Sequence, residues 1–431
     1  MQAGLSTKNA PSPNVVLPHY AFGALSFLVA ATMLFFAAGD LVGHYLSPKL
    51  LSITHVLVLG WITMIIFGAL YQLIPVIMEV KLYSEKLALV NFFIFGTGLV
   101  LLSASFWTFT FGRSIMLETG GVMVVLSMVL FAINTILSAV KTEVKNIENI
   151  TIITAIFWLI LTVVLGLIIV LNFAFQFIPG SHLQLLKSHA HIGMVGWFLL
   201  LVVGVASKLM PMFLIVHKLP RKLLVYAYIL INIGLIALSL GYYFFNEPWF
   251  LTLSATTVIA GIVSFLRFNF IAFSKRIRKK LDVGMKMSAL GFILLGISLV
   301  FGLFSVLSLE FTSQIQTRIE ISYGVLLLFG FLSSLILGQT YKTLPFIVWL
   351  KKYQSKVGKQ KVPLPLELYS DRIANIHLIT FVLGIIMLIT GILTGTVLII
   401  QIAAVLLIIT GLLYNYNVFK IIFHKEINHE S

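Results

Sequence analysis

Long apolar runs recur along the whole sequence and constrain its fold more than any other feature. Twelve of them have the roughly 20 residues that a helix needs to cross a lipid bilayer. Their approximate positions are residues 20–43, 51–78, 84–107, 115–140, 150–178, 186–214, 222–245, 249–273, 284–307, 321–350, 373–395 and 397–423. Hydrophobic residues make up 60% of the chain and charged residues only 10%, a balance that no soluble core requires. The sequence therefore predicts an all-α integral membrane protein with about 12 transmembrane helices.

The predicted spans leave no room for a soluble domain. The longest connection, around residues 351–372, contains Pro363 and Pro365 and is interpreted as a short loop. The first apolar run leads into many further spans and is expected to be a membrane helix rather than a cleaved signal peptide. We therefore expect residues 1–431 to form a single polytopic membrane domain.

The basic residues are distributed unequally between the two sides of the predicted membrane. With both tails and the adjoining helix ends included, 25 of the 29 Lys and Arg residues fall on the side of the even-numbered connections. The exceptions are Lys49, Arg113, Lys187 and Arg318. The positive-inside rule then places both termini in the cytoplasm, most simply at a bacterial inner membrane. The formal charge of +15 thus indicates topology and contact with membrane lipid, and no nucleic-acid partner is expected.

Three of the predicted spans carry an internal repeat. Residues 55–75 read HVLVLGWITMIIFGALYQLIP, residues 191–211 read HIGMVGWFLLLVVGVASKLMP, and residues 325–345 read VLLLFGFLSSLILGQTYKTLP. With the first residue as zero, all three have Gly at +5, Trp or Phe at +6, Gly at +13 and Pro at +20. The copies are spaced by about four helices, so they lie parallel in the membrane. We expect three four-helix repeats, at about 20–145, 150–280 and 284–423, around a pseudo-threefold axis.

Each repeat copy has a face of small packing residues and, at position zero, a residue that in two copies could bind a ligand. On an ideal helix the positions +5, +13 and +20 fall at about 140°, 220° and 200°, so the glycines and the proline share one face. Small residues on one face allow membrane helices to pack closely. The residue at position zero points away from that face. It is His55 in the first copy and His191 in the second, but Val325 in the third.

Several ionisable residues fall in the outer third of the predicted spans, where they suggest a cofactor or metal site. His55 and His191 are the preferred ligands because they occupy equivalent positions. His189 is a second choice, since residues two apart differ by about 200° around a helix and only one of the pair can face a shared site. His44 could add to a metal site, and Asp40 could bind the metal or orient a histidine. Hydrogen bonding within the bundle is the alternative role for His55 and His191. The chain has no cysteine, so thiolate metal sites and disulfides are excluded.

The segment SHAHIGMVGWFLLLVVGVASKLMP at residues 188–211 resembles the HxHxGxxGW…G…LxP segment of subunit I of the haem-copper oxidases, especially the cbb3-type oxidases and nitric oxide reductases. The resemblance implies twelve helices in three four-helix arcs, with cytoplasmic termini and haem ligands toward the outer side. It also implies that His55 matches the usual position of a low-spin haem ligand.

The sequence departs from that family at two sets of ligand positions. Family members have two adjacent histidines on helix 7 for copper, whereas residues 222–245 contain none. They have two histidines on helix 10 for the haems, where this chain has Tyr323 and Val325. A standard haem-copper binuclear centre cannot be assembled from these residues.

The expected function follows from both the resemblance and the departures. The first hypothesis is a divergent haem-copper-oxidase-like protein that holds haem b and/or copper between His55 and His191. It would pass electrons between a quinol and an outer-face cytochrome or cupredoxin, or act on nitric oxide or oxygen, together with other respiratory subunits. The alternative is a non-redox transporter or channel, an assembly factor that delivers copper or haem, or a structural subunit. The incomplete ligand set leaves open whether the chain is an enzyme.

Overall fold

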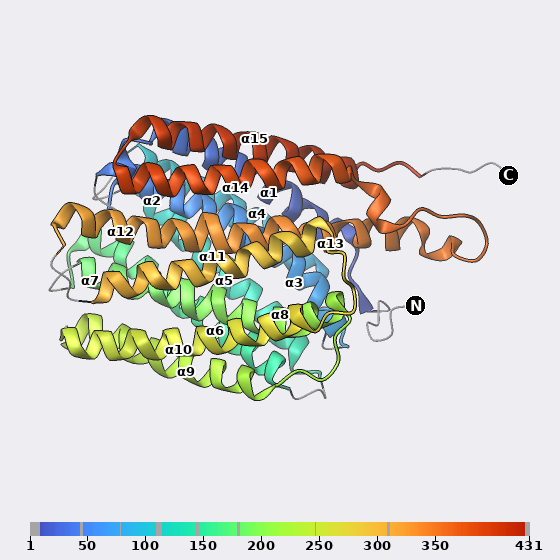
Figure 1. The fold of residues 1–431 in the computed structure, drawn as a ribbon, viewed down its shortest axis with the longest axis horizontal. Helices are drawn as coiled ribbons and strands as arrows, with labels where there is room; N and C mark the ends of the chain where they lie inside the picture. Colours follow the sequence, from blue (N-terminus) through green and yellow to red (C-terminus); the bar gives the residue numbers. More distant parts are fainter. Residues whose placement is uncertain are drawn as a thin grey trace. The chain divides into compact units, whose positions relative to one another are not determined.

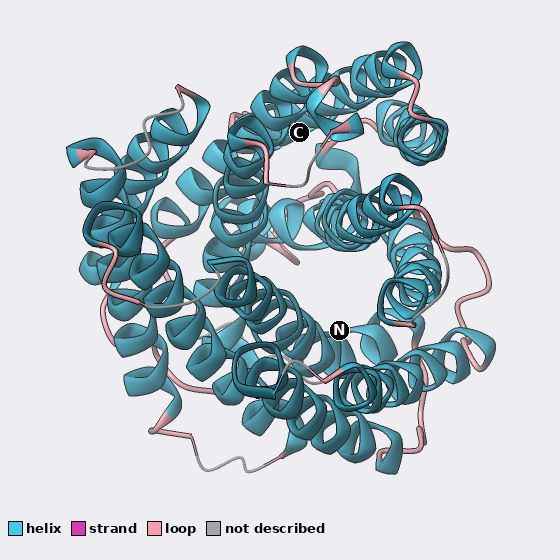
Figure 2. Cartoon of the chain, turned by 90° about the vertical axis from the view of Figure 1, so that its left-hand side faces the viewer, coloured by secondary structure: helices cyan, strands magenta, loops and turns pink. Residues whose placement is uncertain are grey.

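A computed structural model describes residues 9–43, 46–77, 79–108, 114–142, 146–178, 182–245, 247–307 and 311–426. These residues form helices joined by loops and contain no strand (Figure 2). Within them, twelve helices are long and apolar enough to cross a membrane. In chain order the twelve are built from α1 (Pro13–Phe36); α2 (Pro48–His55), η3 (Val56–Thr63) and α3 (Met64–Ile77); α4 (Glu85–Trp107); α5 (Ile115–Ala139); α6 (Ile147–Phe175); α7 (His182–His191), η4 (Ile192–Leu199) and α8 (Leu200–Leu214); α9 (Lys222–Leu240) and η5 (Gly241–Phe245); α10 (Pro248–Ser274); α11 (Val283–Val306); α12 (Ser313–Val325), η6 (Leu326–Leu332) and α13 (Ser333–Tyr353); α14 (Asp371–Thr394); and α15 (Val397–Ile422). The prediction of an all-α protein with twelve spans is confirmed.

The first span lies closer to the N-terminus than the sequence predicted. It begins at Pro13, which suits the first helical turn because proline has no N–H to leave unpaired. The Ser12 side chain accepts a hydrogen bond from the backbone N–H of Asn14 and caps the helix. The helix ends at Phe36, so Asp40 falls in the short 3-10 helix η2 (Asp40–Val42) that follows it.

The chain divides into two compact units. The first comprises Met1–Ile77, Leu281–Leu295 and Gly324–Ser431. In it α14 and α15 lie side by side, and α15 also packs against α1 (Figure 1). The second unit comprises Met78–Lys280 and Gly296–Tyr323. In it α4 pairs with α5, and α9 pairs with α10 (Figure 1).

The +13 glycine of each repeat copy packs against the first helix of the same predicted four-helix repeat. A Cβ added to Gly68 would lie 2.8 Å from the Cβ of His19 on α1, and one added to Gly204 would lie 2.8 Å from a side-chain carbon of Ile152 on α6. One added to Gly338 would lie 2.6 Å from the carbonyl oxygen of Gly284 on α11. A larger side chain at any of these positions would clash with the neighbouring helix, which confirms the predicted packing role of these glycines.

A π-helical segment interrupts all three repeat spans at the same point. Segment η3 follows His55, η4 follows His191 and η6 follows Val325. A π-helix places more residues in each turn than an α-helix, so the ideal-helix angles do not hold beyond position zero. This irregularity was not predicted, because a π segment has no turn residue or proline to mark it. Such segments are rare and occur frequently at functional sites.

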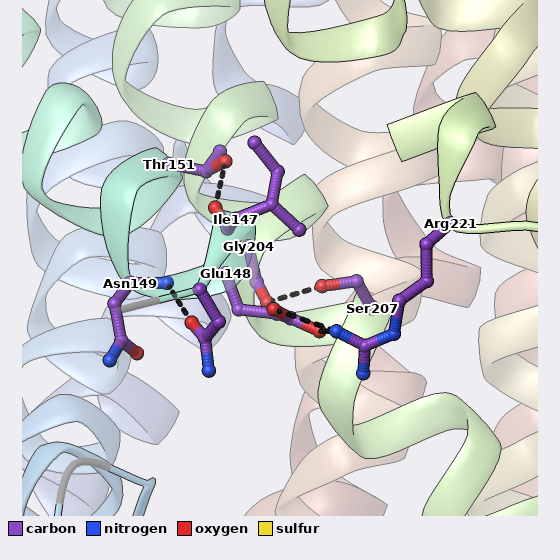
Figure 3. Close-up of polar contacts among 8 residues, drawn as sticks. Ile147, Glu148, Asn149, Thr151, Gly204, Ser207 and Arg221 are labelled. Atoms are coloured by element: carbon purple, nitrogen blue, oxygen red, sulfur yellow. Dashed lines mark hydrogen bonds and ion pairs between the residues drawn. The ribbon is translucent and has the colours of Figure 1, made fainter. Parts of the chain in front are cut away.

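A buried carboxylate ties two helices of the second unit together at the starts of α6 and α9. The side chain of Glu148 is only 1% exposed, and its Oε1 lies 3.1 Å from Nη1 of Arg221 (Figure 3). Beside it the Ser207 hydroxyl donates to the carbonyl oxygen of Gly204. The close approach of α8 to α6 at Gly204 therefore occurs next to the point where Arg221 neutralises Glu148.

A methyl group at Gly338 should weaken the first unit, because it would meet backbone atoms of α11 that cannot move aside. We expect Gly338→Ala to lower the free energy of unfolding by about 1–3 kcal/mol, the usual cost of overpacking a core. Thermal unfolding of the detergent-purified protein measures this effect. Gly324→Ala is the matched control in the same span, since a Cβ there meets nothing within 4 Å. Equal stability of the two variants would contradict the packing argument.

Candidate functional site

His55 ends α2 and lies in the first unit, where its side chain is half-buried. Its Nδ1 donates a hydrogen bond to the carbonyl oxygen of Leu51, one turn earlier, at 2.7 Å. Because a carbonyl only accepts, this bond places the imidazole proton on Nδ1 and the lone pair on Nε2. Histidines that bind metals commonly donate their other ring N–H to a carbonyl or carboxylate in this way.

His191 repeats this arrangement in the second unit. It ends α7, and its Nδ1 donates to the carbonyl oxygen of Lys187 at 2.8 Å. The two histidines therefore share their repeat position, their hydrogen bond and the π segment that follows them. The equivalence predicted from the sequence extends to the local geometry of the ring.

Two tyrosine rings lie against His191. The ring centroid of Tyr242 is 5.3 Å away, and that of Tyr323 is 6.4 Å away in a nearly parallel orientation. Tyr242 belongs to the π segment η5, and Tyr323 to α12. The Tyr323 ring fits here because it lies over Gly302 of α11, where a Cβ would be only 2.9 Å from the ring. His191 thus faces phenols on two other helices.

A carboxylate, that of Glu320, lies one turn before Tyr323 on α12. The Gln316 side chain donates to Oε1 of Glu320 at 3.0 Å and to the carbonyl oxygen of Ser305 at 3.2 Å. Gln316 therefore holds the Glu320 carboxylate against α11.

His189 faces the opposite direction from His191. Its Nδ1 donates to the carbonyl oxygen of Thr162 on α6 at 2.9 Å, and its ring lies over Gly166 of the same helix. The two histidines of the HxH segment consequently have different surroundings, as their spacing predicts. The structure leaves His189 with a helix-packing contact on α6, while His191 meets the tyrosines.

Asp40 lies in the loop after α1. Its carboxylate accepts a hydrogen bond from the hydroxyl of Ser47, and it lines an open hollow of about 500 Å³ with Gly39, Gly43, Leu46 and Ser47. The hydrogen-bond partner of the Asp40 carboxylate is thus a serine. His44, the other candidate in this loop, lies outside the described residues.

No three His, Asp or Glu side chains in the described part of the chain come together in a way that could hold a metal ion. The donor set around each candidate histidine therefore differs from a multi-histidine copper site. The tautomer of His55 and His191 nevertheless fits a single bond from Nε2 to a haem iron or a metal ion. Each of these two histidines could therefore supply one ligand atom, its Nε2.

The sequence pointed to part of this site only. Tyr323 was identified only as the residue at a helix 10 ligand position of the family, and Tyr242 was missed. Tyr242 lies in a run of aromatic residues that resembles ordinary lipid-facing sequence. The contacts among α7, α12 and η5 are needed to bring them together.

Comparisons with known proteins support the fold but do not test the candidate site. No protein-family profile matches the sequence, and no curated protein matches it. Among solved structures, the chain is similar to a haem-copper terminal oxidase determined as a dimer by cryo-electron microscopy. The TM-score is 0.71 at 13% identity, over 97% of this chain and 85% of the oxidase chain. The protein is therefore an integral membrane protein with the fold of a haem-copper terminal oxidase.

Proposed function

We propose that this protein is a divergent redox protein of a respiratory membrane that binds haem b or copper through His55 and His191. The observation that carries the proposal is the pair of equivalent histidines, each with Nδ1 bonded to the carbonyl four residues earlier and each followed by a π segment. A fixed tautomer directs Nε2 to a ligand without any rearrangement of the ring. The fold of a haem-copper terminal oxidase adds support.

The residues of the chain suit electron transfer better than oxygen reduction by the usual binuclear mechanism. A bound haem or copper would supply one-electron transfer. His55 and His191 would bind and orient it, while the apolar side chains of the spans exclude water. The helix 7 and helix 10 histidines that complete a binuclear centre are replaced by other residues. A quinol as electron donor and a cytochrome or cupredoxin at the outer face are the partners that this role requires.

The same ligand set favours a second candidate function, which is delivery of copper or haem to another membrane complex. A site with few protein ligands releases its metal more readily than a full coordination shell. The absence of any cluster of three His, Asp or Glu side chains among the described residues agrees with such a carrier. Transfer of the metal from loaded protein to an acceptor, without turnover of a quinol, would distinguish this function from electron transfer.

The absorption spectrum and metal content of the detergent-purified protein test the first proposal. We expect a Soret band or about one bound copper, and loss of most of that signal in His55→Ala or in His191→Ala, because each variant removes an Nε2 ligand. His217→Ala is the control, since this side chain is exposed in a loop. Protein that contains neither haem nor copper would refute the proposal.

We further propose that both termini face the cytoplasm of a bacterial inner membrane. The chain has no cysteine, so single cysteines can be introduced directly. Lys359→Cys, in the basic connection before α14, should react with a membrane-impermeant maleimide only in inside-out vesicles. Ser313→Cys, exposed at the start of α12, should react only in right-side-out vesicles. The reverse pattern would show that the charge-based orientation is wrong.

A further inference from the structure

The exposed side of α15 leads along the membrane span to a lysine. Large side chains follow one another on this side at intervals of three or four residues, and each is at least 38% exposed: Leu398, Ile402, Val405, Ile409, Leu412 and Tyr416. Residues at this spacing lie on one face of a helix, and an exposed apolar face within a membrane is covered by lipid chains. Lys420 continues the face one turn after Tyr416 and is exposed. The lipid-facing stripe of α15 therefore ends in a positive charge.

The chain that follows α15 is held against the end of α13 in the same unit. The hydroxyl of the buried Tyr353 lies 2.8 Å from Nε2 of His424. Two residues later, Nζ of Lys356 lies 2.7 Å from a carboxylate oxygen of Glu426. Lys425 lies between these two contacts, so its backbone is held beside the end of α15.

Positive charge predominates around this segment. Residues 351–372 and 420–426 contain eight Lys and Arg residues but only three Asp and Glu residues, and one of these acids is already in the ion pair with α13. Burial lowers the pKa of His424 below its ordinary value, and the charges of Lys352 and Lys420 lower it further, although a neighbouring carboxylate opposes them. His424 is therefore neutral at pH 7, and its surroundings hold more positive than negative charge.

An exposed aromatic ring accompanies the lysines. Phe423 is 72% exposed, and it lies three residues after Lys420, on the same side of the helix. Its ring stacks on that of Phe419 with the centroids 6.0 Å apart. Basic and aromatic side chains together are typical of segments at the boundary between headgroups and acyl chains. An acidic soluble protein would match the lysines but not the lipid-facing ring, whereas a phospholipid offers a phosphate to the lysines and acyl chains to the ring.

We infer that Lys420, Phe423 and Lys425 form a binding site for the headgroup of an anionic phospholipid. Lys420 acts electrostatically on His424, and Lys425 follows His424 in the chain, so both positive charges lie close to one residue. The acyl chains would lie along the stripe of α15 that ends at Tyr416. Because the segment is already held against α13, binding requires little further ordering of the backbone. The inference uses none of the candidate cofactor ligands and does not depend on the proposed function.

Competition between phosphatidylglycerol and phosphatidylcholine of equal chain length tests the inference, with native mass spectrometry of the detergent-purified full-length protein as the measurement. We expect preferential binding of phosphatidylglycerol. Lys420→Gln and Lys425→Gln should each lower this binding roughly fivefold, because each removes one positive charge near the headgroup. Phe423→Ser should weaken the binding of both lipids, since the ring contacts acyl chains. All three variants should keep the unfolding temperature of the unaltered protein in detergent without added lipid.

The matched control for the double variant Lys420→Gln/Lys425→Gln is Lys279→Gln/Lys280→Gln. It removes the same charge from two exposed lysines in the basic connection before α11, and it should keep the preference for phosphatidylglycerol. An equal loss in the control would show that net charge alone attracts the lipid and would overturn the inference. Equal binding of the two lipids by the unaltered protein would also overturn it. Displacement of phosphatidylglycerol by inorganic phosphate at equal concentration would overturn the assignment to a lipid, because it would indicate a site for free anions.

Discussion

The contact of a glycine with a neighbouring helix is the interaction on which the rest of this structure depends. In lipid no hydrophobic force holds helices together, so stability comes from close packing and from hydrogen bonds. Gly68, Gly204 and Gly338 provide that packing in all three repeat copies, and a Cβ at any of them would meet atoms within 3 Å. Because these contacts hold one face of each repeat span against its neighbour, the opposite face remains available for other residues.

In each repeat span the π segment lies between position zero, where the histidine of two copies could bind a ligand, and the +13 glycine, which packs against a neighbouring helix. The π segments begin one residue after position zero and end before the +13 glycine. The irregular turns therefore lie between the residue that could bind a ligand and the residue that fixes the helix. Backbone irregularity of this kind costs stability and persists only where the surroundings enforce it. Its presence after Val325 as well as after His55 and His191 shows that it belongs to the repeat and does not depend on the histidine.

The sequence predicted those features that depend on periodicity. Runs of apolar residues predict helices that cross a membrane, and the repeated glycine at +13 predicts a close packing contact, which the structure shows at Gly68, Gly204 and Gly338. It also predicted opposite directions for His189 and His191, since two residues on a helix differ by about 200°. It could not predict the start of α1 at Pro13, which left Asp40 in a loop, or the π turns. It also could not bring Tyr242 to His191, because that contact joins helices that are distant in sequence.

The three repeat copies use the same backbone for different chemistry. Positions −2 and zero hold Ile53 and His55 in the first copy, His189 and His191 in the second, and Tyr323 and Val325 in the third. In the second copy position −2 contacts α6 while position zero faces the tyrosines. In the third copy position −2 supplies Tyr323, whose ring stacks on His191. The third copy has therefore lost a histidine at position zero, yet it contributes a phenol to the surroundings of His191 from the other face of its helix. A search for ligands at equivalent positions finds the histidine pair and misses this contribution, because the residues that meet around His191 are not equivalent by the repeat.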